Sequence, residues 1–463
     1  MRMVARHPAL LDRGAGNHLS VSILQRIRRL MASHFLRNVA IVAGGTATAQ
    51  IIAIAFSPII ARLYGPEAFG ILGVFMATLA VITPLSGLTY GVAIVLPASD
   101  YEARALLKLS LLIGLVVTIL SALVFGGFHQ QIANAIGFTA ASTFLLMAPV
   151  VILLSATAQP LQQWLVRKKQ FRAISRIVVI ESAATGTSKT AVGLIAATAP
   201  ALLVLGTLAS ALQTLLLWLS ARHTLLGRSD RTSAGLETPD NVSLKDVAYR
   251  YRDFPLFRAP QVWLNTVSHS IPTLMLAALL GPAAAGFYTI ARRVLGLPSS
   301  LISGAVGTVF LPRIAEASHR SEKLRPLILK GTAGLALAGL LPFGMVVAFG
   351  PWLFGFVFGA EWVASGQYAR WLAVWLYFGF VNVPSVQAIS LLGLQGQFLA
   401  YEIVVITLRA ASLAFGALVL QSDLAAIALF SITGALVNIS LIVWVLLSSD
   451  TRSREGVRGE GIA

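Results

Sequence analysis

The sequence contains no cysteine among its 463 residues, and charged residues make up only 11% of it. The absence of cysteine excludes disulfides, cysteine-ligated zinc and thiol chemistry. A soluble domain carries about 25% charged residues, so such a low content does not fit one. Acidic residues are the scarcer kind, since 18 Asp and Glu stand against 35 Lys and Arg. The sequence is therefore poor in charged residues, and those it has are mostly basic.

Catalytic motifs are also missing from the sequence. It has no paired-carboxylate site, metal-ligand cluster, Walker loop or nucleophile motif. We therefore expect that the protein is not an enzyme and that it holds no metal or cofactor. His269 stands alone in an apolar stretch, and we interpret it as structural.

Apolar residues are abundant: they make up 57% of the sequence, at a mean hydropathy of +0.80. A helix needs about 20 apolar residues to cross a bilayer, and runs of that length recur from residue 38 to residue 449. We therefore expect an all-α polytopic membrane protein with about 12 transmembrane helices. The expected spans cover residues 38–61, 69–96, 105–126, 141–165, 173–198, 201–221, 259–280, 285–312, 326–349, 367–393, 398–420 and 424–448.

The basic residues are distributed unevenly among these spans. With the N-terminus placed inside, 29 of the 35 Lys and Arg residues fall in inside segments, whereas only Arg62 and Arg370 fall in outside loops. Because inside loops of membrane proteins are enriched in Lys and Arg, this distribution predicts that both termini are cytoplasmic. Topology and attraction to membrane lipids explain the net charge of +17, so we do not expect nucleic-acid binding.

A short motif occurs twice, as RLYGPEAFGIL at residues 62–72 and as ALLGPAAAGFY at residues 278–288. Matching residues are separated by a constant offset of 216, close to half the chain length. The matched pairs are Leu63/Leu279, Gly65/Gly281, Pro66/Pro282, Ala68/Ala284 and Gly70/Gly286. Self-similarity at this period predicts two related helical bundles with a substrate site between them.

Polar stretches suggest the domain boundaries. Residues 1–37 are basic, and we interpret them either as a helix on the inner membrane surface or as a tail. Residues 222–258 mix both signs of charge with Ser, Thr, Gly and Pro, which is typical of a cytoplasmic linker. The expected N-lobe then covers residues 38–221, the C-lobe covers 259–449, and a cytoplasmic tail covers 450–463.

The outside loops are short. The largest, residues 350–366, carries Trp352 and Trp362, which we expect at the membrane interface. No segment outside the membrane is long enough for a folded domain, and this disfavours an enzyme with large catalytic loops.

Three stretches are typical of one family: PIIARLYGPEAFGILGVF at 58–75 with AIVLPASDYEA at 93–103, LQQWLVRKKQFRAISR at 161–176, and residues 252–317. In these stretches, and in span count, the sequence resembles the polysaccharide transporter (Wzx-type) family of lipid-linked oligosaccharide flippases. That family lies in the multidrug/oligosaccharidyl-lipid/polysaccharide exporter superfamily. The resemblance implies two pseudo-symmetric six-helix bundles around a central cavity. It also implies a polyprenyl-pyrophosphate-linked glycan as substrate, flipped to the outer leaflet of the bacterial inner membrane.

Basic residues within the expected spans are candidates for binding this substrate. An ionised group at bilayer depth costs at least ~2.5–3.5 kcal/mol, so each one requires a partner. Arg292 and Arg293 lie on the eighth span, where the repeat offset places the apolar Met76 and Ala77 in the other half. Arg409 lies near the midplane of the eleventh span. Guanidinium groups form paired hydrogen bonds with phosphate oxygens, so we expect these arginines to contact the pyrophosphate.

Each arginine also has a structural alternative. Neighbouring residues on a helix point about 100° apart, so Arg292 and Arg293 need not share a target. One of them could bond to carbonyls at the end of the span while the other extends to the surface. Arg409 could form a buried pair with an acid on another span.

The fifth and first spans supply the other candidates. Lys189 is a candidate substrate contact, and Glu181 is a candidate proton- or cation-coupling carboxylate or else a structural partner for an arginine. Arg37 and Arg62 flank the first span at its inner and outer ends. There they would meet the headgroup as it arrives and leaves, or would anchor the span at the interface.

Uncharged polar residues within the spans have two interpretations as well. Several such residues could form hydrogen bonds with sugar hydroxyls: Asn38, Gln50, Gln159, Gln162, Gln163, Asn265, Ser268, Asn382 and Gln387. They could equally bond between helices, which is the commoner case in membrane bundles.

These features predict a flippase that works by alternating access in the biosynthesis of O-antigen, exopolysaccharide or capsule. A polysaccharide polymerase and glycosyltransferases would be its pathway partners. A cation-coupled small-molecule exporter of the same superfamily is the alternative, but four deep basic residues against Glu181 and Glu402 favour an anionic substrate. A membrane glycan polymerase is a weaker alternative, because large outside loops are missing.

Overall fold

The computed structural model describes residues 34–226, 243–296, 324–392 and 394–459, and these are helical without strands. The long helices of the first half are α2 (His34–Ile82), α4 (Asp100–Ala135), α5 (Ala148–Arg167), α6 (Phe171–Gly193) and α7 (Ala199–Leu226). Those of the second half are α9 (Ala259–Leu280), a helical segment at 282–296, α11 (Leu324–Phe358), α12 (Val363–Val381), α13 (Val383–Leu391), α14 (Gln395–Leu418) and α15 (Asp423–Gly459). Short turns connect them: η1 (Thr83–Leu85), α3 (Tyr90–Ala93), η2 (Thr139–Met147), α8 (Leu244–Arg250), η3 (Phe254–Arg258) and η4 (Ala360–Trp362).

Several expectations fall outside the described residues. These are the surface helix or tail over 1–33, the middle of the linker at 227–242, the second half of the eighth span from 297, and the chain end at 460–463. The first part of the expected cytoplasmic tail continues α15 as helix up to Gly459.

The two copies of the repeated motif share one backbone geometry. α2 consists of two arms joined at Gly65, whose φ of 72° and ψ of 172° interrupt the helix. Gly281, the matching residue, has φ of 91° and ψ of 169° and separates α9 from the segment at 282–296. Positive φ is readily adopted by glycine and is costly for other residues. The glycine of each copy therefore sets a tight break between two apolar helices.

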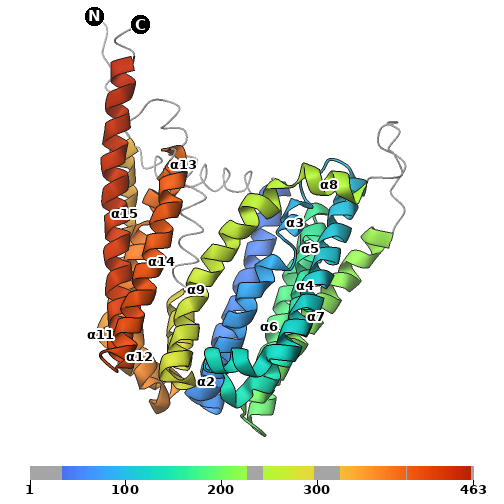
Figure 1. Cartoon of the computed structure of the whole chain (residues 1–463), viewed down its shortest axis with the longest axis horizontal. Helices are drawn as coiled ribbons and strands as arrows, with labels where there is room; N and C mark the ends of the chain where they lie inside the picture. Colours follow the sequence, from blue (N-terminus) through green and yellow to red (C-terminus); the bar gives the residue numbers. More distant parts are fainter. Residues whose placement is uncertain (1–33, 227–242, 297–323, 393, 460–463) are drawn as a thin grey trace, which may run out of the picture.

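The helices pack as two groups that meet along α9. Helices α2 and α4–α7 contact one another and form the N-lobe, whereas α11, α12, α14 and α15 form most of the C-lobe. α9 begins the C-lobe in sequence, and it contacts α2 on one side and α14 on the other. Figure 1 shows α14 and α15 diverging from α9 and the N-lobe toward the end where α15 terminates. The lobes come together at the opposite end (Figure 1).

Seven helices in the described residues are long and apolar enough to cross a membrane, or eight if the bent pair Ala360–Val381 and Val383–Ile389 is one span. The seven lie in α2, α4, η2–α5, α7, α11, α14 and α15. The chain is thus a multi-pass helical membrane protein. α6 and α9 are not among the seven, and they carry Glu181, Lys189 and His269. The arrangement of 12 spans in two six-helix bundles stays a prediction.

Two expected boundaries differ from the structure. The span expected at 69–96 ends as α-helix at Ile82, and Pro84 lies in the turn that follows. Proline lacks the backbone N–H that a helix interior needs. The loop expected at 350–366 is helical as far as Phe358. Trp362, expected at the membrane interface, is only 1% exposed.

Part of the expected linker packs on the N-lobe. Arg250 at the end of α8 forms an ion pair with Glu102 on α4, with Nη1 and Oε1 2.7 Å apart. The Tyr90 hydroxyl donates a hydrogen bond to the Ala248 carbonyl at 3.0 Å. α8 therefore covers one end of the N-lobe.

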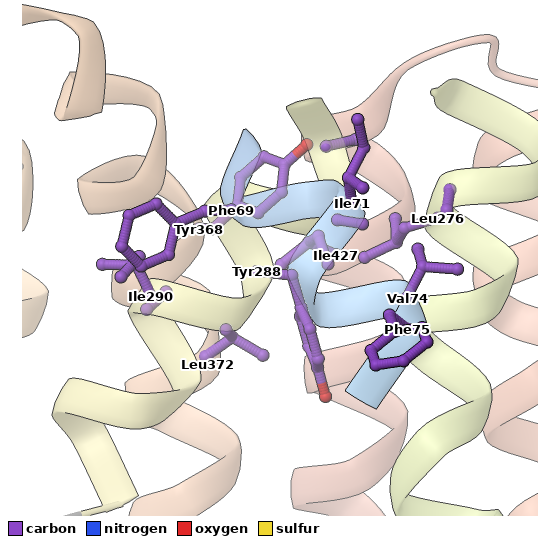
Figure 2. Packing of buried hydrophobic residues seen from close by; sticks show 14 of the residues in the cluster. Phe69, Ile71, Val74, Phe75, Leu276, Tyr288, Ile290, Tyr368, Leu372 and Ile427 are labelled. Carbon is purple, nitrogen blue, oxygen red and sulfur yellow. The ribbon is translucent and has the colours of Figure 1, made fainter. Parts of the chain in front are cut away.

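Aromatic side chains fill the junction where the lobes meet. Figure 2 shows Phe69 of α2 and Tyr288 of the segment at 282–296 within this buried cluster. The Trp362 ring meets Phe69 edge-on at 5.4 Å and Phe287 at 6.2 Å between centroids. Its indole N–H donates to the Ala61 carbonyl at 3.1 Å. Trp362 is buried because it closes this junction between the lobes.

Candidate functional site

A cavity of about 190 Å³ lies between the N-lobe and the helical segment at 282–296, and we name it the interlobe cavity. α2 contributes Ser57 to its wall, and α6 contributes Glu181, Thr185 and Lys189. Arg293 lines it from the other side. Three charged residues that the sequence places on two separate spans therefore share one space.

The two cations of the interlobe cavity share it with one carboxylate, Glu181. Among the described residues, neither Arg293 nor Lys189 forms an ion pair with a carboxylate. Glu181 accepts a hydrogen bond from the Thr185 hydroxyl at 3.3 Å, one turn along the same helix. Two cations and one carboxylate leave the cavity with an excess of positive charge, which attracts an anionic ligand.

A second cavity of about 340 Å³ lies inside the C-lobe, and we name it the C-lobe pocket. Residues of α9, α12, α13, α14 and α15 line it, together with Asn382 at the bend between α12 and α13. Its polar and aromatic lining residues are Asn265, Ser268, His269, Trp375, Phe380, Asn382, Phe398, Tyr401, Glu402, Arg409 and Asn438. The pocket thus combines hydrogen-bond donors and acceptors with one guanidinium group.

Arg409 is held in the C-lobe pocket by aromatic rings. Its guanidinium carbon lies 4.0 Å from the centroid of the Trp375 ring and 4.4 Å from that of Phe430. Cation–π contacts orient the guanidinium plane but leave its charge in place. The Arg409 Nε is buried without a hydrogen-bond partner in the described part of the chain. Glu402 lines the same pocket and makes no ion pair with Arg409 there.

Arg292 points toward the C-lobe, unlike its neighbour Arg293. Its Nη1 donates to the Tyr288 hydroxyl at 2.9 Å, and its Nη2 lies 2.9 Å from Nδ1 of His269. Its guanidinium carbon is 5.6 Å from the Trp375 ring centroid. Arg292 therefore contacts His269 and Trp375, two residues that line the C-lobe pocket, but does not line the pocket itself.

Asn382 marks the bend that opens the C-lobe pocket. It is 2% exposed, and its side-chain nitrogen donates to Oδ1 of Asn438 at 3.1 Å. Asn438 in turn donates to the Gly434 carbonyl at 2.8 Å. The Asn382 side-chain oxygen finds no donor among the described residues. Asn382 and Asn438 thus form a hydrogen bond between helices, which is the commoner of the two interpretations of such residues. The side-chain oxygen of Asn382 stays available as an acceptor.

Arg62 and Arg37 are the two remaining candidates from the sequence, and the structure describes the side chain of Arg62 only. Arg62 Nη2 donates to the Phe356 carbonyl at 2.6 Å, and its Nε donates to the Val357 carbonyl at 3.2 Å. These bonds join α2 to the end of α11, so Arg62 links the lobes. Arg37 lies in the first turn of α2, and its side chain is outside the described residues.

Sequence patterns missed several residues of the C-lobe pocket. His269, interpreted as structural, lines the pocket and contacts Arg292. Trp375, Tyr401 and Asn438 carry no local signal, because each lies in an apolar span like many others. Within the described residues, no group of three or more His, Asp or Glu side chains could hold a metal ion.

Comparison with known proteins gives a family match over most of the chain. A family model described as "Polysaccharide biosynthesis protein" matches residues 35–318. A curated relative, the amylovoran biosynthesis protein AmsL of Erwinia amylovora, is 23% identical over 119 residues. That alignment covers 26% of this chain and 31% of the relative, so it spans less than a third of the relative's length.

Solved structures share the fold over nearly the whole chain. One is the inward-facing conformation of a multidrug resistance MATE family transporter of the MOP superfamily, with a TM-score of 0.65 and 16% identity, covering 87% of this chain and 95% of that one. Another is the lipid II flippase MurJ in an inward closed conformation, with a TM-score of 0.61 and 15% identity, covering 89% and 90%. At such low identity the likeness establishes the transporter fold alone.

Proposed function

Because the chain belongs to the polysaccharide biosynthesis protein family, we propose that it flips a polyprenyl-pyrophosphate-linked oligosaccharide across a bacterial inner membrane. The interlobe cavity carries this proposal. Arg293 and Lys189 come from different lobes and face one space, and neither forms an ion pair with a carboxylate in the described residues. A pyrophosphate supplies the negative charge and the acceptor oxygens that these two side chains lack.

The attraction between a phosphate and these cations depends on the cavity. Two unit charges 4 Å apart attract by about 1 kcal/mol in water and about 4 kcal/mol at an effective dielectric constant of 20. A partly dehydrated cavity thus selects an anionic headgroup, while the polyprenyl tail remains in the lipid. The glycan would occupy the polar space beside the headgroup.

Alternating access would move the headgroup from one leaflet to the other. The lobes diverge toward the end where α15 terminates and meet at the opposite end (Figure 1). With the termini in the cytoplasm, as the distribution of Lys and Arg predicts, the described state would receive substrate from the cytoplasmic side. Parting of the lobes at the junction of Trp362 and Arg62 would release it to the outer leaflet.

A cation-coupled exporter is the second candidate, and Glu181 is the observation that favours it. This carboxylate lines the interlobe cavity beside Thr185, where it could bind a proton or sodium ion. The same carboxylate is equally suited to couple flipping to an ion gradient. Because cations outnumber carboxylates in the interlobe cavity, we place the flippase first.

Transport by the full-length protein in proteoliposomes distinguishes the two candidates. One assay follows a fluorescent polyprenyl-pyrophosphate-linked glycan as it becomes accessible to a membrane-impermeant quencher, and a parallel assay follows uptake of ethidium. We expect flipping of the glycolipid and no ethidium transport. Arg293→Ala with Lys189→Ala should abolish flipping, whereas Arg172→Ala, an exposed residue in the first turn of α6, should not. Ethidium transport without glycolipid flipping would overturn the proposal.

A further inference from the structure

Basic side chains line two separate cavities of the protein, whereas one pyrophosphate needs only one of them. Arg293 lines the interlobe cavity with Lys189, whereas Arg409 lines the C-lobe pocket, whose lining residue His269 contacts Arg292. Arg292 and Arg293 are adjacent in sequence, but their side chains turn to different spaces. A lipid-linked glycan carries a single diphosphate, so the second space requires another ligand group.

The guanidinium of Arg409 is prepared for an anion. Trp375 and Phe430 fix its plane at 4.0 Å and 4.4 Å, so little conformational entropy is lost when a ligand binds. Among the described residues it has no carboxylate partner, and its Nε has no hydrogen-bond partner of any kind. A charge at this depth is costly unless a ligand balances it.

The remaining groups of the C-lobe pocket require hydrogen-bond donors. Glu402 lines the pocket as an acceptor, and the Asn382 side-chain oxygen lacks a donor among the described residues. A pyrophosphate carries more negative charge than a sugar carboxylate and has no hydroxyl groups, so Glu402 would repel it more strongly and Asn382 would gain no donor. Sugar hydroxyls donate hydrogen bonds, and a carboxylate on the same ring would accept them from Arg409.

We propose that the C-lobe pocket binds an acidic sugar of the glycan, a residue that carries a carboxylate. Arg409 holds the carboxylate, Glu402 accepts hydrogen bonds from ring hydroxyls, and Arg292 adds positive charge next to His269. The pyrophosphate occupies the interlobe cavity at the same time. This assignment rests on the proposed function, since the sugar reaches the pocket as part of the flipped lipid.

The test compares two lipids that differ in one group. Full-length protein in vesicles of phosphatidylcholine, which contain no anionic lipid, is given two polyprenyl-pyrophosphate-linked trisaccharides. One contains a hexuronic acid, and the other contains the corresponding neutral hexose at the same position. We expect the acidic lipid to be flipped at least ten times faster. Arg409→Gln should lower this ratio at least tenfold, Arg409→Lys should lower it less, and Arg172→Gln should leave it unchanged.

The outcomes separate this assignment from the function on which it rests. Equal rates for both lipids, or an Arg409→Gln variant that slows both by the same factor, would overturn the acidic-sugar site and leave the flippase standing. Failure of the wild-type protein to flip either lipid would overturn both. A variant that no longer folds is recognised because it loses flipping of the neutral lipid and elutes as aggregate.

Discussion

The carbonyl oxygen of Pro282 occupies the space that a β-carbon on Gly70 would need. The carbonyl oxygen of Pro66 stands in the same relation to Gly286. These four residues are equivalent in pairs within the repeated motif, so each copy offers a proline carbonyl and receives one against a glycine. Such reciprocal contacts are those of a two-fold relation between the halves. The lobes therefore touch through the motif that reveals the repeat.

Alanine at either glycine should push the lobes apart at this contact. Overpacking costs typically ~1–3 kcal/mol, about 5- to 150-fold in a two-state equilibrium. Since the chain has no cysteine, introduced cysteines can carry spin labels at Ile195 and Trp352, which are 89% and 65% exposed on the two lobes. We expect Gly70→Ala to lengthen the distance between the labels.

Gly44→Ala on the same helix is the matched control, because a β-carbon there would meet nothing within 4 Å. An unchanged distance distribution in Gly70→Ala would show that this contact does not hold the lobes together.

Arg62 should act as a latch between the lobes. Its two hydrogen bonds reach the carbonyls of Phe356 and Val357 at the end of α11. We expect Arg62→Ala to raise the population with separated lobes about 5- to 150-fold, since its two hydrogen bonds are worth ~0.5–1.5 kcal/mol each. Arg370→Ala serves as control, since Arg370 donates to the Ala348 carbonyl within the C-lobe. The same spin-label pair measures both, and equal effects of the two substitutions would argue against a latch.

Glu181 should couple flipping to an ion. If this carboxylate carries a proton or binds sodium, Glu181→Gln removes the ionisable group while keeping its size and its contact with Thr185. We expect the wild-type flipping rate to respond to an imposed proton or sodium gradient, and the variant to lose the response. Glu67→Gln, on α2 and outside the interlobe cavity, is the control. A variant that still responds would assign coupling to another group.

The repeat and its breaks could be predicted from the sequence because they depend on local chemistry. Gly65 and Gly281 occupy positions that only glycine adopts easily, and the same residues mark the motif. The adjacency of Arg292 and Arg293 likewise indicates that they need not share a target, because neighbouring residues on a helix point about 100° apart. In the structure Arg293 lines the interlobe cavity and Arg292 contacts His269 of the C-lobe pocket, which agrees with that helix geometry.

The rest depends on how distant segments pack. Nothing near Trp362 in sequence signals that the Ala61 carbonyl accepts a hydrogen bond from its indole N–H, so the sequence predicts the membrane interface for this tryptophan. His269 is alone in sequence, and its contact with Arg292 arises only when α9 packs against the segment at 282–296. The C-lobe pocket could not be predicted from the sequence for the same reason, since its lining residues come from several helices that are distant in sequence.

Binding of polyprenyl pyrophosphate without sugars tests the central claim most directly, because it isolates the diphosphate headgroup. The affinity of the purified full-length protein is measured for this lipid and for the monophosphate with the same tail. We predict at least tenfold tighter binding of the pyrophosphate, about 1.4 kcal/mol. The variant with Arg293→Ala and Lys189→Ala should lose that preference, while Arg172→Ala should keep it. Equal affinity of the wild-type protein for both lipids, or a preference that survives loss of both cations, would contradict the account.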